Sequence, residues 1–171
     1  MMPPLLQIFL VALVAYIAAT IRMTQITAPY GGLEMMPDLR FGFTADSLRE
    51  RRENSWGEQG CQAYVKAATL DLFPYMEAYT VALWCLATVS TRNNSTRTKN
   101  LARILATLPV CFDVVETLIL RQTCLSDISD EVVAIASIAN QFKWVFFVGF
   151  FAIYLPLWLV NSCVVDDTKA D

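Results

Sequence analysis

The 171-residue chain contains no histidine, and none of its five cysteines forms a C-x-x-C pair. It therefore lacks the commonest general base, and a zinc knuckle or a thioredoxin-type redox pair is excluded. Positive charge is not in excess either: 13 lysines and arginines face 16 aspartates and glutamates, so no nucleic-acid partner is indicated. The sequence also shows no phosphate-binding loop or nucleophile elbow. We expect no cofactor and no bound metal.

Apolar residues, in contrast, are abundant. They make up 56% of the chain, and the mean hydropathy is +0.44. A soluble domain has roughly 45–50% apolar residues, and here they also come in long blocks. This pattern predicts an integral, multi-pass membrane protein whose first partner is the lipid bilayer.

Four of these blocks are long enough to cross a bilayer as helices. They cover residues 3–21, 68–91, 101–120 and 143–161. Their order predicts an all-α fold, an antiparallel four-helix transmembrane bundle forming a single domain over residues 1–171. The first block could instead be a cleaved signal peptide, because Ala18 and Ala19 resemble a cleavage site. Its length and the absence of a preceding basic region favour a retained helix.

Residues 22–57 form the polar part of the chain. Within them, "ADSLRERRENSW" predicts a short amphipathic helix in the first loop, capped by Thr44 and ended by Gly57. Its charges alternate in sign, which favours a solvated helix lying over the bundle rather than a membrane-surface or partner-binding helix. The next helix should start near Glu58, run past Ser90 and kink at Pro74.

The orientation follows from the loops. Loop 92–103 carries basic residues and no acid, so by the positive-inside tendency it is cytoplasmic, together with both termini. Residues 22–65 and 121–142 would then share the opposite side. The glycosylation sequons at Asn93 and Asn94 would reverse this orientation if they were used, but unused sequons in a polar turn are favoured.

Antiparallel threading should collect the charged residues of the spans in one half of the bilayer. The expected polar intramembrane cluster consists of Asp71, Glu77, Tyr79, Asp113, Glu116, Lys143, Arg22 and Arg121. Asp113 lies eight residues before Arg121, about 12 Å along a helix. A carboxylate at that depth costs roughly 2.5–3.5 kcal/mol unless it faces the interior and is paired.

Two interpretations of this cluster remain open. Ion pairs and hydrogen bonds could fix helix packing, since lipid gives little hydrophobic drive for helix association. Alternatively, the cluster could bind an ion, a proton or a lipid headgroup, because ionisable groups inside a membrane are candidates for function. Cations in similar number to the acids favour the structural interpretation.

Several short stretches together resemble a family of small four-span membrane proteins of bacteria and eukaryotes. These are "DLRFGFTADSL", "WGEQGCQAYVKAATLDLFPYMEAY", "FDVVETLIL" and "ASIANQFKWVFF", within residues 38–160. The residues that match its pattern are Asp38, Arg40, Gly42, Asp71, Pro74, Tyr79, Asp113, Glu116 and Lys143. Thr117 departs from it, standing where the family has asparagine, and "GCQAY" lacks the basic residue that usually follows the glycine. The family has no established activity, so the resemblance implies architecture and names no reaction.

Two cysteines could form a disulfide. Cys61 and Cys124 are expected on the same side of the membrane, near the ends of neighbouring helices. A disulfide between them would require that side to be exoplasmic.

The function predicted best is that of a non-catalytic accessory or scaffold subunit, or an assembly partner, in a larger complex with other membrane proteins. One alternative is a small transporter or a lipid- or ion-binding protein that uses the polar cluster as its site. A second is a small lipid-modifying enzyme with Glu77 or Asp113 as proton carrier. The missing catalytic motifs argue against an enzyme.

Overall fold

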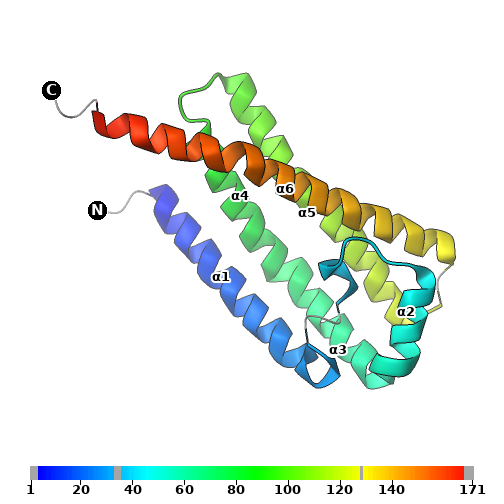
Figure 1. The fold of residues 1–171 in the computed structure, drawn as a ribbon. Helices are drawn as coiled ribbons and strands as arrows, with labels where there is room; N and C mark the ends of the chain where they lie inside the picture. The colour runs from blue at the N-terminus through cyan, green and yellow to red at the C-terminus, as the bar shows by residue number, and fades with distance from the viewer. Residues whose placement is uncertain (1–3, 33–35, 128, 168–171) are drawn as a thin grey trace.

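The computed structural model describes residues 4–32, 36–127 and 129–167 (Figure 1). About 90% of it is helical, and these residues include no strand. This confirms the predicted all-α fold.

The first helix, α1, runs from Pro4–Thr27 and is uncharged until Arg22. A 3-10 turn, η1 (Ala28–Tyr30), follows it, and Gly31 ends the turn with a φ of 98°. A second 3-10 turn, η3 (Pro37–Leu39), leads into the segment that crosses to α6.

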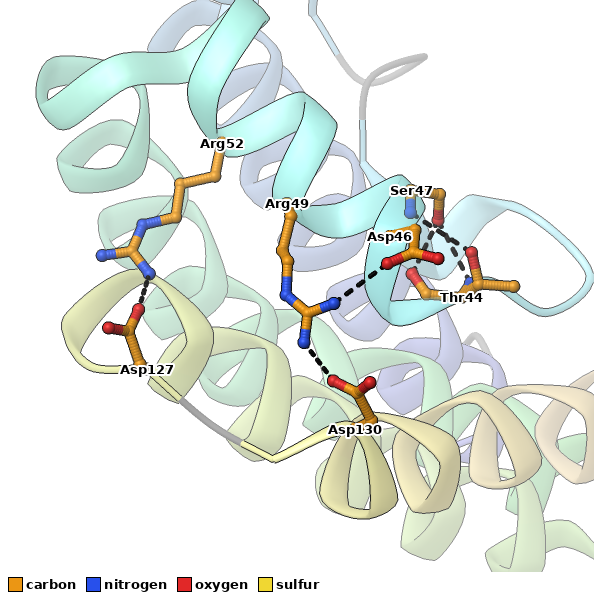
Figure 2. Close-up of polar contacts among 7 residues, drawn as sticks. All are labelled: Thr44, Asp46, Ser47, Arg49, Arg52, Asp127 and Asp130. Atoms are coloured by element: carbon orange, nitrogen blue, oxygen red, sulfur yellow. Dashed lines mark hydrogen bonds and ion pairs between the residues drawn. The ribbon is translucent and has the colours of Figure 1, made fainter.

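A short helix, α2 (Ala45–Arg51), begins at a capping box. The Thr44 hydroxyl accepts a hydrogen bond from the Ser47 amide, and the Ser47 hydroxyl accepts one from the Thr44 amide (Figure 2). This reciprocal pair satisfies two amides that a helix start leaves without partners. One π-helical turn, η4 (Arg52–Trp56), then connects α2 to α3 (Gly57–Leu70).

Pro74 interrupts the next helix. Between α3 and α4 (Met76–Ser90), the chain forms the wide turn η5 (Asp71–Tyr75), in which Phe73 is extended at φ −155° and ψ 120°. Proline lacks an amide hydrogen and its ring crowds the preceding turn, which favours an interruption. Here the extended Phe73 completes the break, whereas α5 and α6 continue through Pro109 and Pro156. The interruption changes the helical phase of α4 relative to α3.

The last two helices are the longest, α5 (Thr96–Leu125) and α6 (Asp130–Asp167). They pack along one another, and α4 contacts both, whereas α1 packs on α3, η5 and α4 (Figure 1). Ser95 caps α5 by accepting a hydrogen bond from the Thr98 amide at 3.3 Å.

Different elements meet at the two ends of the molecule. At one end, the start of α1, the turn between α4 and α5 and the last turns of α6 lie together (Figure 1). Asn161 of α6 donates a hydrogen bond to the Ser90 carbonyl there, at 2.6 Å. At the other end, α2 and the start of α3 lie beside the end of α5 and the start of α6 (Figure 1). A buried core at that end stacks Trp56 on Tyr64, with ring centroids 5.0 Å apart.

Three segments are long and apolar enough to cross a membrane: Pro4–Tyr30, Ala45–Ser90 and Asp130–Asn161. These segments confirm the prediction that the chain is a membrane protein. Helix α5 is not among the three, since Asp113 and Glu116 interrupt its apolar stretch.

Candidate functional site

Lys143 joins two carboxylates in the interior. Its ammonium Nζ lies 3.0 Å from Asp113 Oδ1 and 2.6 Å from Glu116 Oε2. The exposed fractions of the three side chains are 10%, 8% and 0%, so water does not screen the pairs. The two acids are three residues apart on α5 and therefore both face α6, which carries the lysine.

Neutral donors complete the hydrogen bonding of both acids. The Tyr79 hydroxyl of α4 donates to Asp113 Oδ2 at 2.7 Å, and Asn140 Nδ2 of α6 donates to Glu116 Oε1 at 2.7 Å. Buried carboxylates need such partners, because an unpaired charge in a low-dielectric interior is costly. Three helices thus contribute side chains to one network.

A third carboxylate, Asp71, lies in η5 and is 5% exposed. Its Oδ2 accepts a hydrogen bond from the Thr117 hydroxyl at 2.9 Å. Thr117 follows Glu116 on α5, so Asp71 lies beside the same network. We call this set the polar cluster; its members are Asp71, Tyr79, Asp113, Glu116, Thr117, Asn140 and Lys143.

The loop before α2 is fastened to α6 next to the cluster. The Gly42 amide donates to Asn140 Oδ1 at 2.9 Å, and the Phe43 amide donates to Ser137 Oγ at 3.0 Å. Gly42 has a φ of +81°, and a Cβ there would lie 2.8 Å from Nε2 of Gln141. A side chain is therefore disfavoured chiefly by the backbone conformation, since the exposed end of Gln141 could move away from a Cβ.

A cavity of about 130 Å³ opens beside the polar cluster. Its lining includes the charged side chains of Asp71, Asp113 and Lys143, together with the aromatic rings of Tyr75 and Trp144. It could hold several water molecules or a small ligand group, and it offers both charge and aromatic faces to an occupant.

Aromatic contacts hold the wall of this cavity in place. Tyr16 of α1 stacks on Tyr75, with ring centroids 4.7 Å apart and the two hydroxyls 3.1 Å apart. Tyr75 in turn meets Tyr79 edge-on at 5.7 Å. On the opposite side, Lys143 Nζ lies 5.7 Å from the centroid of the Trp144 ring.

Three residues predicted for the polar cluster lie elsewhere, which corrects the prediction. Arg22 is exposed and donates to Gln25 on its own helix at 3.3 Å. Glu77 is exposed, because the phase change at η5 turns its neighbour Met76 inward instead. Arg121 is half-buried, and among the residues described it makes no hydrogen bond or ion pair with the cluster.

The residues of the predicted loop motif, Asp38, Arg40 and Gly42, also differ in their surroundings. Gly42 lies against α6 as described above, whereas Arg40 is exposed. The backbone of Asp38 is part of η3, but its side chain lies outside the described part of the chain.

A disulfide joins Cys61 of α3 to Cys124 of α5, with Cα atoms 5.2 Å apart. This is the pairing that the sequence left open. Of the cysteines whose side chains the structure describes, Cys85 and Cys111 are free, the first buried and the second exposed.

Ion pairs reinforce the end of the molecule that carries the disulfide. Arg49 contacts Asp130 at the start of α6 and lies 2.9 Å from Asp46, while Arg52 lies 2.8 Å from Asp127 (Figure 2). The hydrogen bond and charge of Asp130 raise the pKa of the Arg49 guanidinium above its usual value. All five side chains are substantially exposed, so these pairs orient α2 more than they stabilise the fold.

Ser137 and Tyr16 support the site without having been predicted as part of it. Ser137, Asn140 and Lys143 recur at intervals of three residues, which places them along one side of α6. That spacing was a usable signal for a polar face on this helix. Tyr16 carried no such signal, since it stands alone in an apolar run.

No family model, no curated protein and no solved structure matches this chain. The resemblance to the four-span family therefore stays a prediction.

Proposed function

We propose that the chain crosses the membrane four times, with α5 as the fourth spanning helix beside the three apolar segments. Helix α5 packs along α6 and α4, both within segments that are apolar enough to span. Ala102 and Ala106 of α5 and Ala87 of α4 are fully buried, the small-residue contact typical of helices in lipid. Its two acids are buried and paired, so they do not meet acyl chains.

We also propose an orientation. The end with the disulfide and α2 is exoplasmic, and loop 92–103 is cytoplasmic together with both termini. A disulfide supports this, because such bonds persist in oxidising compartments. The basic residues of loop 92–103 support it independently. Glycosylation mapping tests it: a sequon inserted after Gly57 should be modified, and Asn93 and Asn94 should not be.

As its function, we infer that the protein binds a small ligand or ion inside the membrane, the first alternative predicted from the sequence. The observation that carries this proposal is the cavity beside Asp71, Asp113 and Lys143. A cluster that only fixed helix packing would be filled by its own side chains. Here, two acids and the lysine instead border open space.

The balance of charge supports the same proposal. The structural interpretation depended on cations in similar number to the acids, but Arg22 and Arg121 are not part of the polar cluster. As defined, the cluster holds three carboxylates and one ammonium group. An excess of buried acid in lipid is costly unless a bound cation or proton offsets it.

The test is a native purification in mild detergent, followed by mass spectrometry of the small molecules and lipids that stay bound. We expect a bound species that is lost in Asp71→Asn and weakened in Tyr75→Leu, which removes the aromatic ring, with both variants still monodisperse. Glu77→Gln is the matched control, because it removes an exposed acid close by on α4. Equal retention by Asp71→Asn and Glu77→Gln would refute the cavity as the site.

The accessory or scaffold role remains a second candidate. It is favoured by the way in which Asn140 and Lys143 tie α5, α6 and the first loop into one unit. This role predicts co-purification with a larger membrane complex and tolerance of Asp113→Glu. Of the two carboxylates proposed as proton carrier of a lipid-modifying enzyme, Glu77 does not line the cavity and Asp113 does, where it is already paired with Lys143.

A further inference from the structure

An apolar groove on the outer face of α6 meets the polar cavity. The two share Leu39 and Trp144, which line both. The groove is lined by Leu39, Phe41, Trp144, Val145, Val148 and Gly149. The charged pocket and the apolar surface are therefore neighbours, with Leu39 and Trp144 between them.

We propose that the cavity and groove together form one site for a single-chain membrane amphiphile with an ammonium headgroup and no phosphate. The headgroup would occupy the cavity against Asp71, beside the ion pair of Asp113 and Lys143, and the chain would lie in the groove along α6. This inference rests on the proposed function, since it takes the cavity to be a ligand site, and it names the class of ligand.

The cavity favours a cation. Its charged lining consists of two carboxylates and Lys143, and Glu116 adds a further negative charge behind the lysine. Tyr75 and Trp144 add aromatic faces, which attract ammonium groups through the negative face of the ring. Acid and aromatic walls together are the usual recognition chemistry for organic ammonium ions.

The same lining disfavours a phosphate beside the amine. The ammonium of Lys143 is already engaged by Asp113 and Glu116. Arg22 and Arg40 are exposed and do not line the cavity. A phosphodiester would therefore meet carboxylates without a free cation, so an amine carried directly on an alkyl chain fits better than an aminophospholipid.

The groove favours a chain over a small soluble amine. Phe41 and Val148, which line it, are 67% and 62% exposed. Val148 belongs to a segment apolar enough to span, so the groove opens toward acyl chains. An alkyl chain could remain against lipid while its headgroup enters the cavity past Leu39 and Trp144.

The experiment measures apparent Kd by native mass spectrometry for four probes added to the full chain in nonionic detergent: dodecylamine, dodecanol, lysophosphatidylethanolamine and ethylamine. We expect dodecylamine to bind at least tenfold more tightly than each of the other three. Val148→Trp fills the groove without touching the cavity and should weaken dodecylamine at least tenfold, with ethylamine unchanged. Val160→Trp is the matched control, since Val160 is 60% exposed on the same helix but does not line the groove.

Three results overturn the inference: dodecanol or the lysophospholipid binding as tightly as dodecylamine, ethylamine doing so, or Val148→Trp behaving like Val160→Trp. The proposed function survives each of them if Asp71→Asn still abolishes binding of whatever occupies the cavity. If none of the four probes binds and the native purification yields no ligand dependent on Asp71, both the inference and the proposed function fail.

Discussion

Replacing Lys143 with methionine tests how the polar cluster is stabilised. The substitution keeps a long, flexible side chain but removes the charge that lies 3.0 Å from Asp113 and 2.6 Å from Glu116. Both carboxylates would stay buried, at 8% and 0% exposure, without their cation. Removing one partner of a buried ion pair costs about 3 to 5 kcal/mol, because the remaining charge is neither solvated nor paired.

This loss of stability should lower the melting temperature of the protein in detergent, which circular dichroism measures. For a chain of this size, each kcal/mol corresponds to about 2 to 4 °C, so Lys143→Met should melt about 6 to 20 °C below the wild type. Lys66→Met is the matched control, since Lys66 is exposed on α3, and it should melt within about 2 °C of the wild type.

A second variant separates loss of charge from loss of packing. Adding Asp113→Asn and Glu116→Gln to Lys143→Met removes all three charges and should recover most of the lost stability, since neutral polar groups are cheaper to bury. The reasoning is refuted if Lys143→Met melts like Lys66→Met, or if the triple variant is no more stable than Lys143→Met alone.

Three further substitutions address other contacts. Gly42→Ala should lower the free energy of unfolding by about 1 to 2 kcal/mol, because an L-residue at its φ of +81° is strained. Gly149→Ala is the control and should not lower it, since Gly149 has open space around it. Equal melting temperatures of the two variants would contradict the strained backbone at Gly42. Replacing both Cys61 and Cys124 with serine should lower the free energy of unfolding by about 4 kcal/mol, because the disulfide closes a loop with a sequence separation of 63 residues. Alkylation of both cysteines in the unreduced wild type, measured by mass spectrometry, would disprove the bond. Thr117→Val should cost about 1 to 3 kcal/mol in chemical unfolding by removing a donor from a buried carboxylate, and a neutral effect would show that this hydrogen bond is dispensable.

Part of this arrangement could be predicted from the sequence. The spacing of Asp113 and Glu116 and the antiparallel order of the helices together predicted that both acids face inward, in the same half of the bundle as Lys143. Glu77 could not be placed correctly, because the turn at Pro74 changes the helical phase by an amount that only the folded backbone defines. The outward direction of Arg22 could not be predicted either, since a single polar residue between apolar neighbours has no periodicity that would place it on a helix face.

The fastening of the first loop was also beyond prediction. It depends on the backbone amides of Gly42 and Phe43. Every residue except proline has such an amide, so the sequence does not indicate which amides bond to α6. The acceptors, Ser137 and Asn140, are common polar residues whose partners depend on the path of the loop.

The side chain of Asn140 bonds in two directions at once. Its amide nitrogen donates to Glu116, which is fully buried on α5, and its oxygen accepts from Gly42, in the loop before α2. A rotation of this one amide cannot preserve both bonds. A displacement of Glu116 that turned this amide would therefore also break the Gly42 bond, and the loop would be held to α6 by the bond from Phe43 to Ser137.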